Sequence, residues 1–262
     1  MSSSNEYVPP KIWTWEGPRA GEEWRYSGIN RPIAGPTHEK ALPVGRHPLQ
    51  LYSRGTPNGV KVTVMLEELL ALGHSGAEYD AWLIDIHKGD QFGSGFVEAN
   101  PNSKIPALLD RSGPKPRRVF ESGSILLYLA DKFGKMGGKT AEEKARVREW
   151  LFWEFDRLAP NVYRPRAIKR GFMKADDNVY SLYTGLANDA LKVLDAALAK
   201  SPFLVGDEAT IADVAVYGDV AYAEEGAIDL GPYANVKAWM GRIEQLPGFK
   251  KYEDVLPKQD AA

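Results

Sequence analysis

The chain has 262 residues, of which 44% are hydrophobic and 26% charged, and its formal net charge is −2. This balance gives no electrostatic reason to expect nucleic acid or an anionic membrane as a partner, and no apolar run approaches the roughly 18 residues that span a bilayer. There is no cysteine, which excludes disulfide bonds, zinc–thiolate sites and cysteine nucleophiles.

The first residues lack the basic and apolar regions of a secretory signal, so we expect a cytoplasmic protein. Residues 1–48 show no helical or strand periodicity but contain Trp13, Trp15 and Trp24. Because large aromatic side chains gain most from burial, we expect an extended arm that lies on the protein surface or on a partner subunit. A flexible leader is the alternative.

Residues 49–134 alternate predicted strands with predicted helices. Short apolar runs predict strands over 48–53, 78–86, 105–110 and 117–121, and helical spacing predicts helices over 60–72 and 122–134. The order β-α-β-α-β-β-α is that of a thioredoxin-like α/β domain, a small mixed sheet covered by helices.

Beyond a glycine- and lysine-rich linker the strand signals vanish, so residues 139–256 predict an all-α domain. Thr140 and Glu143 have the spacing of a capping box, and so do Thr210 and Asp213. Further helices are predicted over 177–200, 210–225 and 234–245. We assign Asp213 a structural role. The four histidines form no helical ligand pair, and we expect no metal site.

The turn between the first strand and the first helix holds Thr56 and Asn58. Unpaired N–H groups and the helix dipole favour an anion at such a position, and both side chains can donate hydrogen bonds to it. The alternative is that Asn58 only caps the helix.

Two later junctions add binding features. Ile105 precedes Pro106 at a strand start, where a cis bond would leave the Ile105 backbone free to pair with an extended peptide. Glu121 and Ser122 join a strand to a helix, and there a carboxylate beside helix-start N–H groups offers partners to the ammonium and carboxylate of an amino-acid end. Ser122 as a simple N-cap is the alternative.

The first strand–helix turn of thioredoxin-like folds commonly carries a CxxC motif, whereas this turn carries Thr-Pro-Asn. A site with anion donors and a peptide edge, but no thiol of its own, suits a peptide that brings the thiol. Glutathione is the candidate.

From about residue 12 to residue 133 the chain strongly resembles the nu class of glutathione transferases. The resemblance lies in INRPIAGPTHEKALPVGRHPLQLYSRGTPNGVKVTVMLEELLALG, AEYDAWLIDI, GDQFGSGFVEANPNSKIPALLD and RVFESGSILLYLADKFG. It implies a glutathione transferase fold, a homodimer, and a glutathione thiolate stabilised by Thr56 and Asn58.

The resemblance also implies the remaining glutathione contacts. Glu121 and Ser122 would hold the γ-glutamyl end, and Ile105 before cis Pro106 would pair with the cysteinyl backbone. The glycyl end would meet Gln91 and Lys104. Members of this class can hold two glutathione molecules in each site, and Asn30 would help to bind the second.

The energetics agree with this implied thiolate. A free thiol has a pKa near 8.5, and lowering it by about two units needs roughly 2.7 kcal/mol. Two hydrogen bonds at about 1 kcal/mol each, with a helix dipole at about 0.3–1 kcal/mol, supply this amount. No general base is required.

The segment 149–172, EWLFWEFDRLAPNVYRPRAIKRGF, departs from the nu-class pattern, and the second half resembles other bacterial transferases more closely. Its basic residues Arg164, Arg166, Lys169 and Arg170 could meet substrate carboxylates, but we favour a solvated surface. Three tyrosines are candidate pocket residues, although for each we favour a packing role over a catalytic one: Tyr163, Tyr217 and Tyr222. We expect the apolar run 150–155 to be core or pocket wall.

The leading hypothesis is a glutathione-dependent disulfide oxidoreductase, because a second glutathione can resolve a mixed disulfide. A transferase or lyase that acts on an aryl or thioether electrophile is the nearest alternative. A third is a regulatory protein that binds glutathione without turnover. In the first two cases the partner is a small-molecule disulfide or electrophile.

Overall fold

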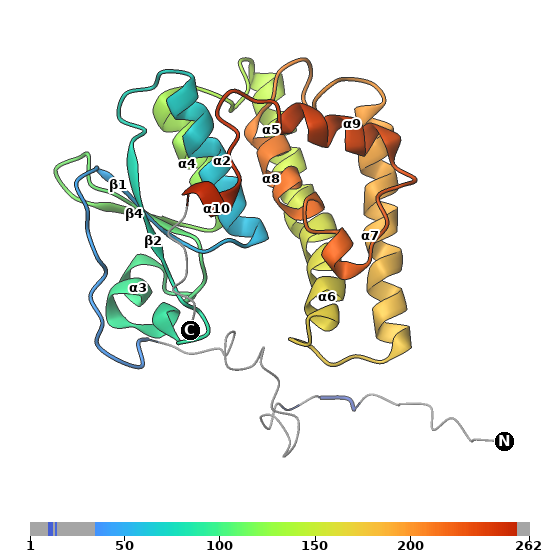
Figure 1. The fold of residues 1–262 in the computed structure, drawn as a ribbon, viewed down its shortest axis with the longest axis horizontal. Helices are drawn as coiled ribbons and strands as arrows, with labels where there is room; N and C mark the ends of the chain where they lie inside the picture. The colour runs from blue at the N-terminus through green and yellow to red at the C-terminus, as the bar shows by residue number, and fades with distance from the viewer. Residues whose placement is uncertain (1–9, 13, 15–34, 256–262) are drawn as a thin grey trace.

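The computed structural model describes residues 10–12, 14 and 35–255 (Figure 1). Most of the predicted arm, including its three tryptophans and Asn30, lies outside these residues. The N-terminal half contains, in chain order, β1 (Leu49–Ser53), α2 (Pro57–Ala71), β2 (Tyr79–Leu83), η1 (Asp90–Phe92), α3 (Ser94–Ala99), β3 (Ala107–Asp110), β4 (Arg117–Phe120) and α4 (Ser122–Phe133).

These strands form one mixed sheet in the order β2-β1-β3-β4. β1 pairs with β2 in parallel, while β3 runs antiparallel to both β1 and β4. Helices α2 and α4 lie together on one side of the sheet, and α3 lies apart from them near the strands (Figure 1). The sequence therefore predicted the thioredoxin-like fold correctly.

Strand β1 shows why this sheet needs helices on both faces. All five of its residues are buried. Leu49 and Leu51 belong to the main core with α2 and α4, whereas Tyr52 belongs to a second core with Phe96 of α3. Because successive side chains point to opposite faces of a strand, a strand that is apolar at consecutive positions is covered on both sides.

The C-terminal half is all helical. It contains α5 (Ala141–Trp153), the π-helical η2 (Glu154–Leu158), α6 (Ala159–Lys169), α7 (Asp177–Leu198), α8 (Ile211–Val220), η3 (Glu224–Gly226), α9 (Ala234–Ile243) and α10 (Tyr252–Val255). Both predicted capping boxes are present, at Thr140 with Glu143 and at Thr210 with Asp213. Among the described residues, no helix is both long and apolar enough to cross a bilayer.

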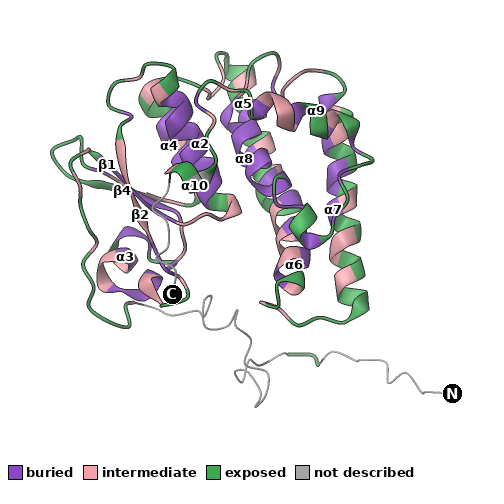
Figure 2. Ribbon diagram, viewed as in Figure 1, coloured by how far each residue is buried: buried purple, intermediate pink, exposed green. Residues whose placement is uncertain are grey.

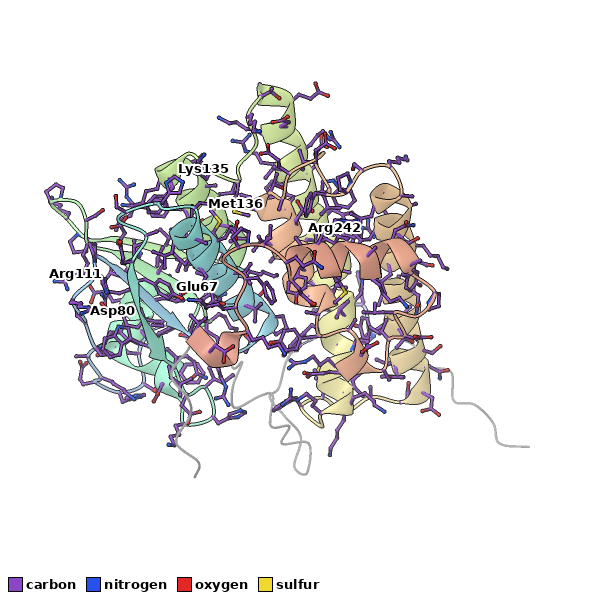
Figure 3. The ribbon with its side chains drawn as sticks, turned by 45° about the horizontal axis from the view of Figure 1, so that its top comes forward. Glu67, Asp80, Arg111, Lys135, Met136 and Arg242 are labelled. Carbon is purple, nitrogen blue, oxygen red and sulfur yellow. The ribbon has the colours of Figure 1, made fainter. Side chains whose placement is uncertain are left out.

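Helix α8 joins the two halves. All ten of its residues are buried (Figure 2), and it packs against both α2 and α5. The approach to α2 is close, because a Cβ on Gly218 would lie 2.8 Å from the Pro57 carbonyl oxygen. At its start, the Ile211 N–H donates to the carbonyl of Met136, which lies in the linker between the halves (Figure 3). The candidate functional site lies beside this junction.

The run 150–155 is largely core or pocket wall, as predicted: Leu151 is buried, Trp150 and Trp153 pack against the core, and Phe155 lines a cavity between the two halves although it is 70% exposed. Phe152 is the exception, at 73% exposed. Residues that follow one another along a helix cannot all face one side of it. The sequence also did not predict α6, which carries Pro160 in its first turn and Pro165 inside.

Candidate functional site

A cavity of about 950 Å³ opens between the two halves and is lined by residues of both. It brings together the predicted site residues of the first half, which come from four separate loops and helix starts. Those residues are Thr56, Asn58, Gln91, Lys104, Ile105, Pro106, Glu121 and Ser122. Asn30, the remaining predicted contact, lies outside the described residues.

Thr56 is the N-cap of α2, with an extended backbone at φ −133°. Its hydroxyl oxygen accepts a hydrogen bond from the Gly59 N–H at 3.3 Å. The hydroxyl proton donates to the Arg54 carbonyl at 3.5 Å, a long hydrogen bond that an anion in the cavity can replace while Thr56 still caps the helix. Gly59 is needed at this turn because a Cβ there would lie 2.0 Å from the Arg54 carbonyl oxygen.

Asn58 does not cap α2, contrary to the alternative prediction for this residue. The helix begins at Pro57, so Asn58 is already inside the first turn. Its side-chain oxygen accepts hydrogen bonds from Lys61 Nζ at 2.8 Å and from Ser122 Oγ at 3.3 Å. Within the described residues no acceptor pairs with its side-chain nitrogen, which is therefore the end of the amide left for a ligand.

The start of α4 also differs from the capping alternative. The N-cap residue is Glu121, at φ 66° and without a side-chain cap, and Ser122 is the first helical residue. A non-glycine residue with positive φ carries backbone strain, and such strain concentrates at functional sites. The Ser122 hydroxyl instead reaches across to Asn58, which links the starts of α4 and α2 inside the cavity.

The bond between Ile105 and Pro106 is cis, as predicted. Neither the N–H nor the carbonyl of Ile105 has a hydrogen-bond partner among the described residues. Ile105 lines the cavity just before the start of β3. A peptide in extended conformation can use both groups.

Two charged residues of the cavity wall have no ionic partner in the part of the chain that the structure describes. The Lys104 ammonium is one, and burial lowers its pKa. The Glu121 carboxylate, on another loop, is the second. By contrast, Arg54 pairs with Asp85 at 3.1 Å. An uncompensated cation and an uncompensated anion in one cavity suit a ligand that carries both charges.

Of the residues predicted from the second half, the structure places Tyr163, Arg166 and Tyr222 in the cavity wall. It does not place Tyr217 there: this side chain is core, and its hydroxyl donates to Glu244 at 2.9 Å. Arg164 is not in the wall either, because its guanidinium stacks over the ring of Tyr183 at 4.7 Å. Phe155 and Phe172 add an apolar surface to the same wall.

The basic cluster of this half is only partly the solvated surface that we favoured. Lys169 is exposed, but the Arg166 side chain is only 12% exposed and donates to Glu225 at 2.7 Å. Arg170 binds the same carboxylate at 2.9 Å. One glutamate thus neutralises much of the wall, which the sequence could not show because Glu225 lies 55 residues or more along the chain.

Sequence reasoning also missed a buried ionic group beneath Asn58, formed by Lys61, Glu154 and Asp219. A lysine inside the apolar run of α2 was the available signal, since lysine is almost never fully buried unless it is paired. Among the described residues, no group of three or more acidic or histidine side chains is arranged to hold a metal ion.

Two family models match the chain. Residues 48–131 match the glutathione S-transferase N-terminal domain, and residues 184–247 match the glutathione S-transferase C-terminal domain. The sequence is 48% identical to the disulfide-bond oxidoreductase YghU of Escherichia coli strain K12, over 95% of this chain and 88% of that protein.

Solved structures show the same similarity in three dimensions. Glutathione transferase YghU from Streptococcus pneumoniae, complexed with glutathione, superimposes with a TM-score of 0.82 at 40% identity, over 92% of this chain and 95% of that one. A glutathione transferase from Burkholderia graminis, with two glutathione molecules bound per subunit, gives a TM-score of 0.69 at 32% identity, over 76% and 85% of the two chains.

Proposed function

The chain belongs to the glutathione S-transferase family, and we propose that it is a nu-class member that reduces disulfide bonds with glutathione. The observation that carries this proposal is the pairing of Thr56 and Asn58 at the start of α2, in a cavity without a protein thiol. The Asn58 amide nitrogen is left for a ligand, and the Thr56 hydroxyl makes only a long 3.5 Å hydrogen bond to the Arg54 carbonyl, so the site is suited to stabilise a thiolate that the ligand brings.

We assign the glutathione contacts from the geometry of the cavity wall. Glu121, with Ser122 beside it, takes the γ-glutamyl ammonium and carboxylate, and the backbone of Ile105 before cis Pro106 pairs with the cysteinyl residue. Lys104 takes the glycyl carboxylate, and Gln91 lies at the same end. These assignments give each uncompensated charge of the wall an opposite charge on the peptide.

The proposed reaction needs two glutathione molecules. The first thiolate attacks one sulfur of the substrate disulfide, the S–S bond breaks, and the departing thiolate takes a proton from solvent. The second thiolate attacks the glutathione sulfur of this mixed disulfide and releases oxidised glutathione with the second substrate thiol. Two glutathione molecules are thus oxidised for each disulfide reduced, and no metal takes part.

The aromatic wall formed by Phe155, Phe172 and Tyr222 supports a second candidate function, attack of the same thiolate on an aryl or thioether electrophile. We propose glutathione binding for the domain at 49–134, with the helical domain at 139–256 selecting the second substrate and the arm at 1–48 contributing Asn30. Because the reaction consumes reduced glutathione, we place the protein in the cytoplasm.

We also propose a homodimer. Phe152 on α5 is 73% exposed, and a second copy of the chain would remove it from water. Light scattering would give twice the mass of the chain, and Phe152→Glu should shift the population toward the monomer.

Calorimetric titration tests the proposed function directly. We expect binding of two reduced glutathione molecules per subunit, or tight binding of the oxidised form. The variant Asn58→Ala should retain most of the affinity but turn over more slowly. Binding of a single reduced molecule with no affinity for the oxidised form would favour the aryl or thioether reaction. No binding of either form would contradict both.

A further inference from the structure

Lys61 is buried at the base of the site, with a side chain that is 1% exposed. Its ammonium donates to Asn58 Oδ1 and to Glu154 Oε1, each at 2.8 Å. Asp219 Oδ2 lies 2.9 Å away as an ion pair. A lysine ammonium has three N–H groups, and two of them make these hydrogen bonds while Asp219 lies within ion-pair distance.

The fold makes specific room for this side chain. A Cβ on Gly218 of α8 would lie 2.5 Å from Lys61 Cγ and 2.9 Å from its Cε. The glycine therefore leaves room between α2 and α8 for the aliphatic part of the Lys61 side chain. Glu154 begins the π-helical turn between α5 and α6, and Asp219 lies near the end of α8. Two elements of the helical half therefore hold a residue of the glutathione-binding half.

The contact with Asn58 decides which end of the amide faces the ligand. An ammonium can only donate, so it can bond the amide oxygen and not the amide nitrogen. The Ser122 hydroxyl can bond the same oxygen from the other helix. With its oxygen held, Asn58 presents N–H groups to the cavity. The reversed amide would present its oxygen, which repels a thiolate.

We propose that Lys61 is a positioning residue for the reaction proposed above: it fixes the amide of Asn58 so that the nitrogen faces the glutathione thiolate, and Glu154 and Asp219 hold Lys61 in place. The helical half thereby controls how well the other half stabilises the thiolate. This role rests on the proposed function, because it acts only through Asn58 and a bound thiol.

The surrounding charges agree with this role. Burial lowers the pKa of Lys61, but Asp219 and Glu154 outweigh burial and hold the pKa above its ordinary value, so the ammonium persists at every working pH. Burial raises the pKa of Glu154, and the neighbouring Asp219 raises it further, because two acidic groups that face one cation ionise less readily together.

The test measures the pKa of the bound glutathione thiol, from the ultraviolet absorbance of the thiolate in saturated complexes. Lys61→Met keeps the aliphatic part of the side chain and removes the ammonium, but it leaves the buried acidic groups of Glu154 and Asp219 without a cation. The variant Lys61→Met/Glu154→Gln/Asp219→Asn replaces all three ionisable groups together and preserves shape. Lys132→Met is the matched control, because it breaks a lysine–carboxylate pair, with Asp110 at 2.6 Å, outside the cavity wall.

We expect the triple variant to raise the thiol pKa by about one unit, as Asn58→Ala does, which from a wild-type pKa of about 6.5 is a roughly threefold loss of thiolate at about pH 7. Combined with Asn58→Ala it should add less than about 0.3 units, because both changes remove the same hydrogen bond. Affinity for S-methylglutathione, which has no thiol, should stay within about twofold of wild type, a result that a merely unfolded site would not give. Lys132→Met should leave the pKa unchanged.

A wild-type pKa in the triple variant, or a full additional shift on top of Asn58→Ala, would overturn the positioning role while leaving the proposed function intact. If Asn58→Ala itself left the thiol pKa unchanged, the proposed thiolate site would fail, and the role of Lys61 would fail with it.

Discussion

Arg166 Nε donates to Glu225 Oε2 at 2.7 Å and so joins α6 to the short helix η3 in the wall of the cavity. The Arg166 guanidinium also stacks 4.9 Å from the centre of the Tyr222 ring. Because Arg170 shares the same carboxylate, the charge of this wall depends on a single acidic residue.

Glu225→Gln should therefore favour anionic disulfides. Removing the carboxylate leaves two guanidiniums uncompensated, and we expect KM for a disulfide that carries carboxylates to fall several-fold at low salt, with little change for a neutral disulfide. Steady-state kinetics at two ionic strengths measure this. Glu224→Gln, one residue away and outside the wall, is the control; an equal effect of both changes would contradict the explanation.

Thr56→Val should lower both the free energy of unfolding and the fraction of bound glutathione that is a thiolate. The change removes the cap of α2, worth about 1 kcal/mol of unfolding free energy, and one donor to the thiol, which raises the thiol pKa by about 0.7 units. Urea unfolding and thiolate absorbance measure the two effects. Thr56→Ser should restore both, and failure of serine to restore the thiol pKa would rule out the hydroxyl as the donor.

The buried carboxyl of Glu154 makes stability depend on pH. Burial, with Asp219 beside it, raises the pKa of this group from 4.5 to about 8, although Lys61 opposes the shift. A carboxyl with a raised folded pKa holds its proton when the unfolded chain has lost it, so unfolding free energy falls as the pH rises from about 4.5 to about 8.

Glu154→Gln should remove that part of the pH dependence, a slope of about 1.4 kcal/mol for each pH unit within the interval. Urea unfolding of both proteins at pH 5, 6.5 and 8.5 checks it. Parallel pH profiles for wild type and variant would show that Glu154 does not keep its proton in the folded state.

Asp213→Ala should destabilise the fold by about 3–5 kcal/mol without changing the chemistry of the site. The carboxylate is fully buried and accepts hydrogen bonds from the backbone of Leu204 and Thr210, the Thr210 hydroxyl and the Trp239 indole. Thermal unfolding measures the loss. At temperatures where the variant is folded, the thiol pKa should equal that of wild type, and a shift would contradict a purely structural role.

Local patterns in the sequence were enough to predict the succession of strands and helices in the first half and the two capping boxes of the second, because each depends on residues within a few positions of one another. The cis bond at Pro106 was predicted through the family resemblance. The pairing of Asn58 with Ser122 across 64 positions was not predicted, although the resemblance assigned both residues to one site.

The rest depended on contacts between distant elements. Lys61 meets Glu154 across 93 positions, so its place in the apolar run of α2 could indicate burial but not its partners. Tyr217 was a candidate for the pocket with packing as the favoured explanation, and the full burial of α8 places it in the core. The π-helical turn at Glu154–Leu158, which contains Phe155, has no sequence signature.

The most direct test of the account is the stoichiometry of turnover with a small disulfide and with a chloro-aromatic substrate, each supplied with reduced glutathione. We predict that the enzyme oxidises two glutathione molecules for each disulfide reduced, at a rate well above any chloro-aromatic conjugation, and that Asn58→Ala lowers this rate about threefold near neutral pH. Faster formation of a thioether from the chloro-aromatic, with no oxidised glutathione from the disulfide, would contradict the account.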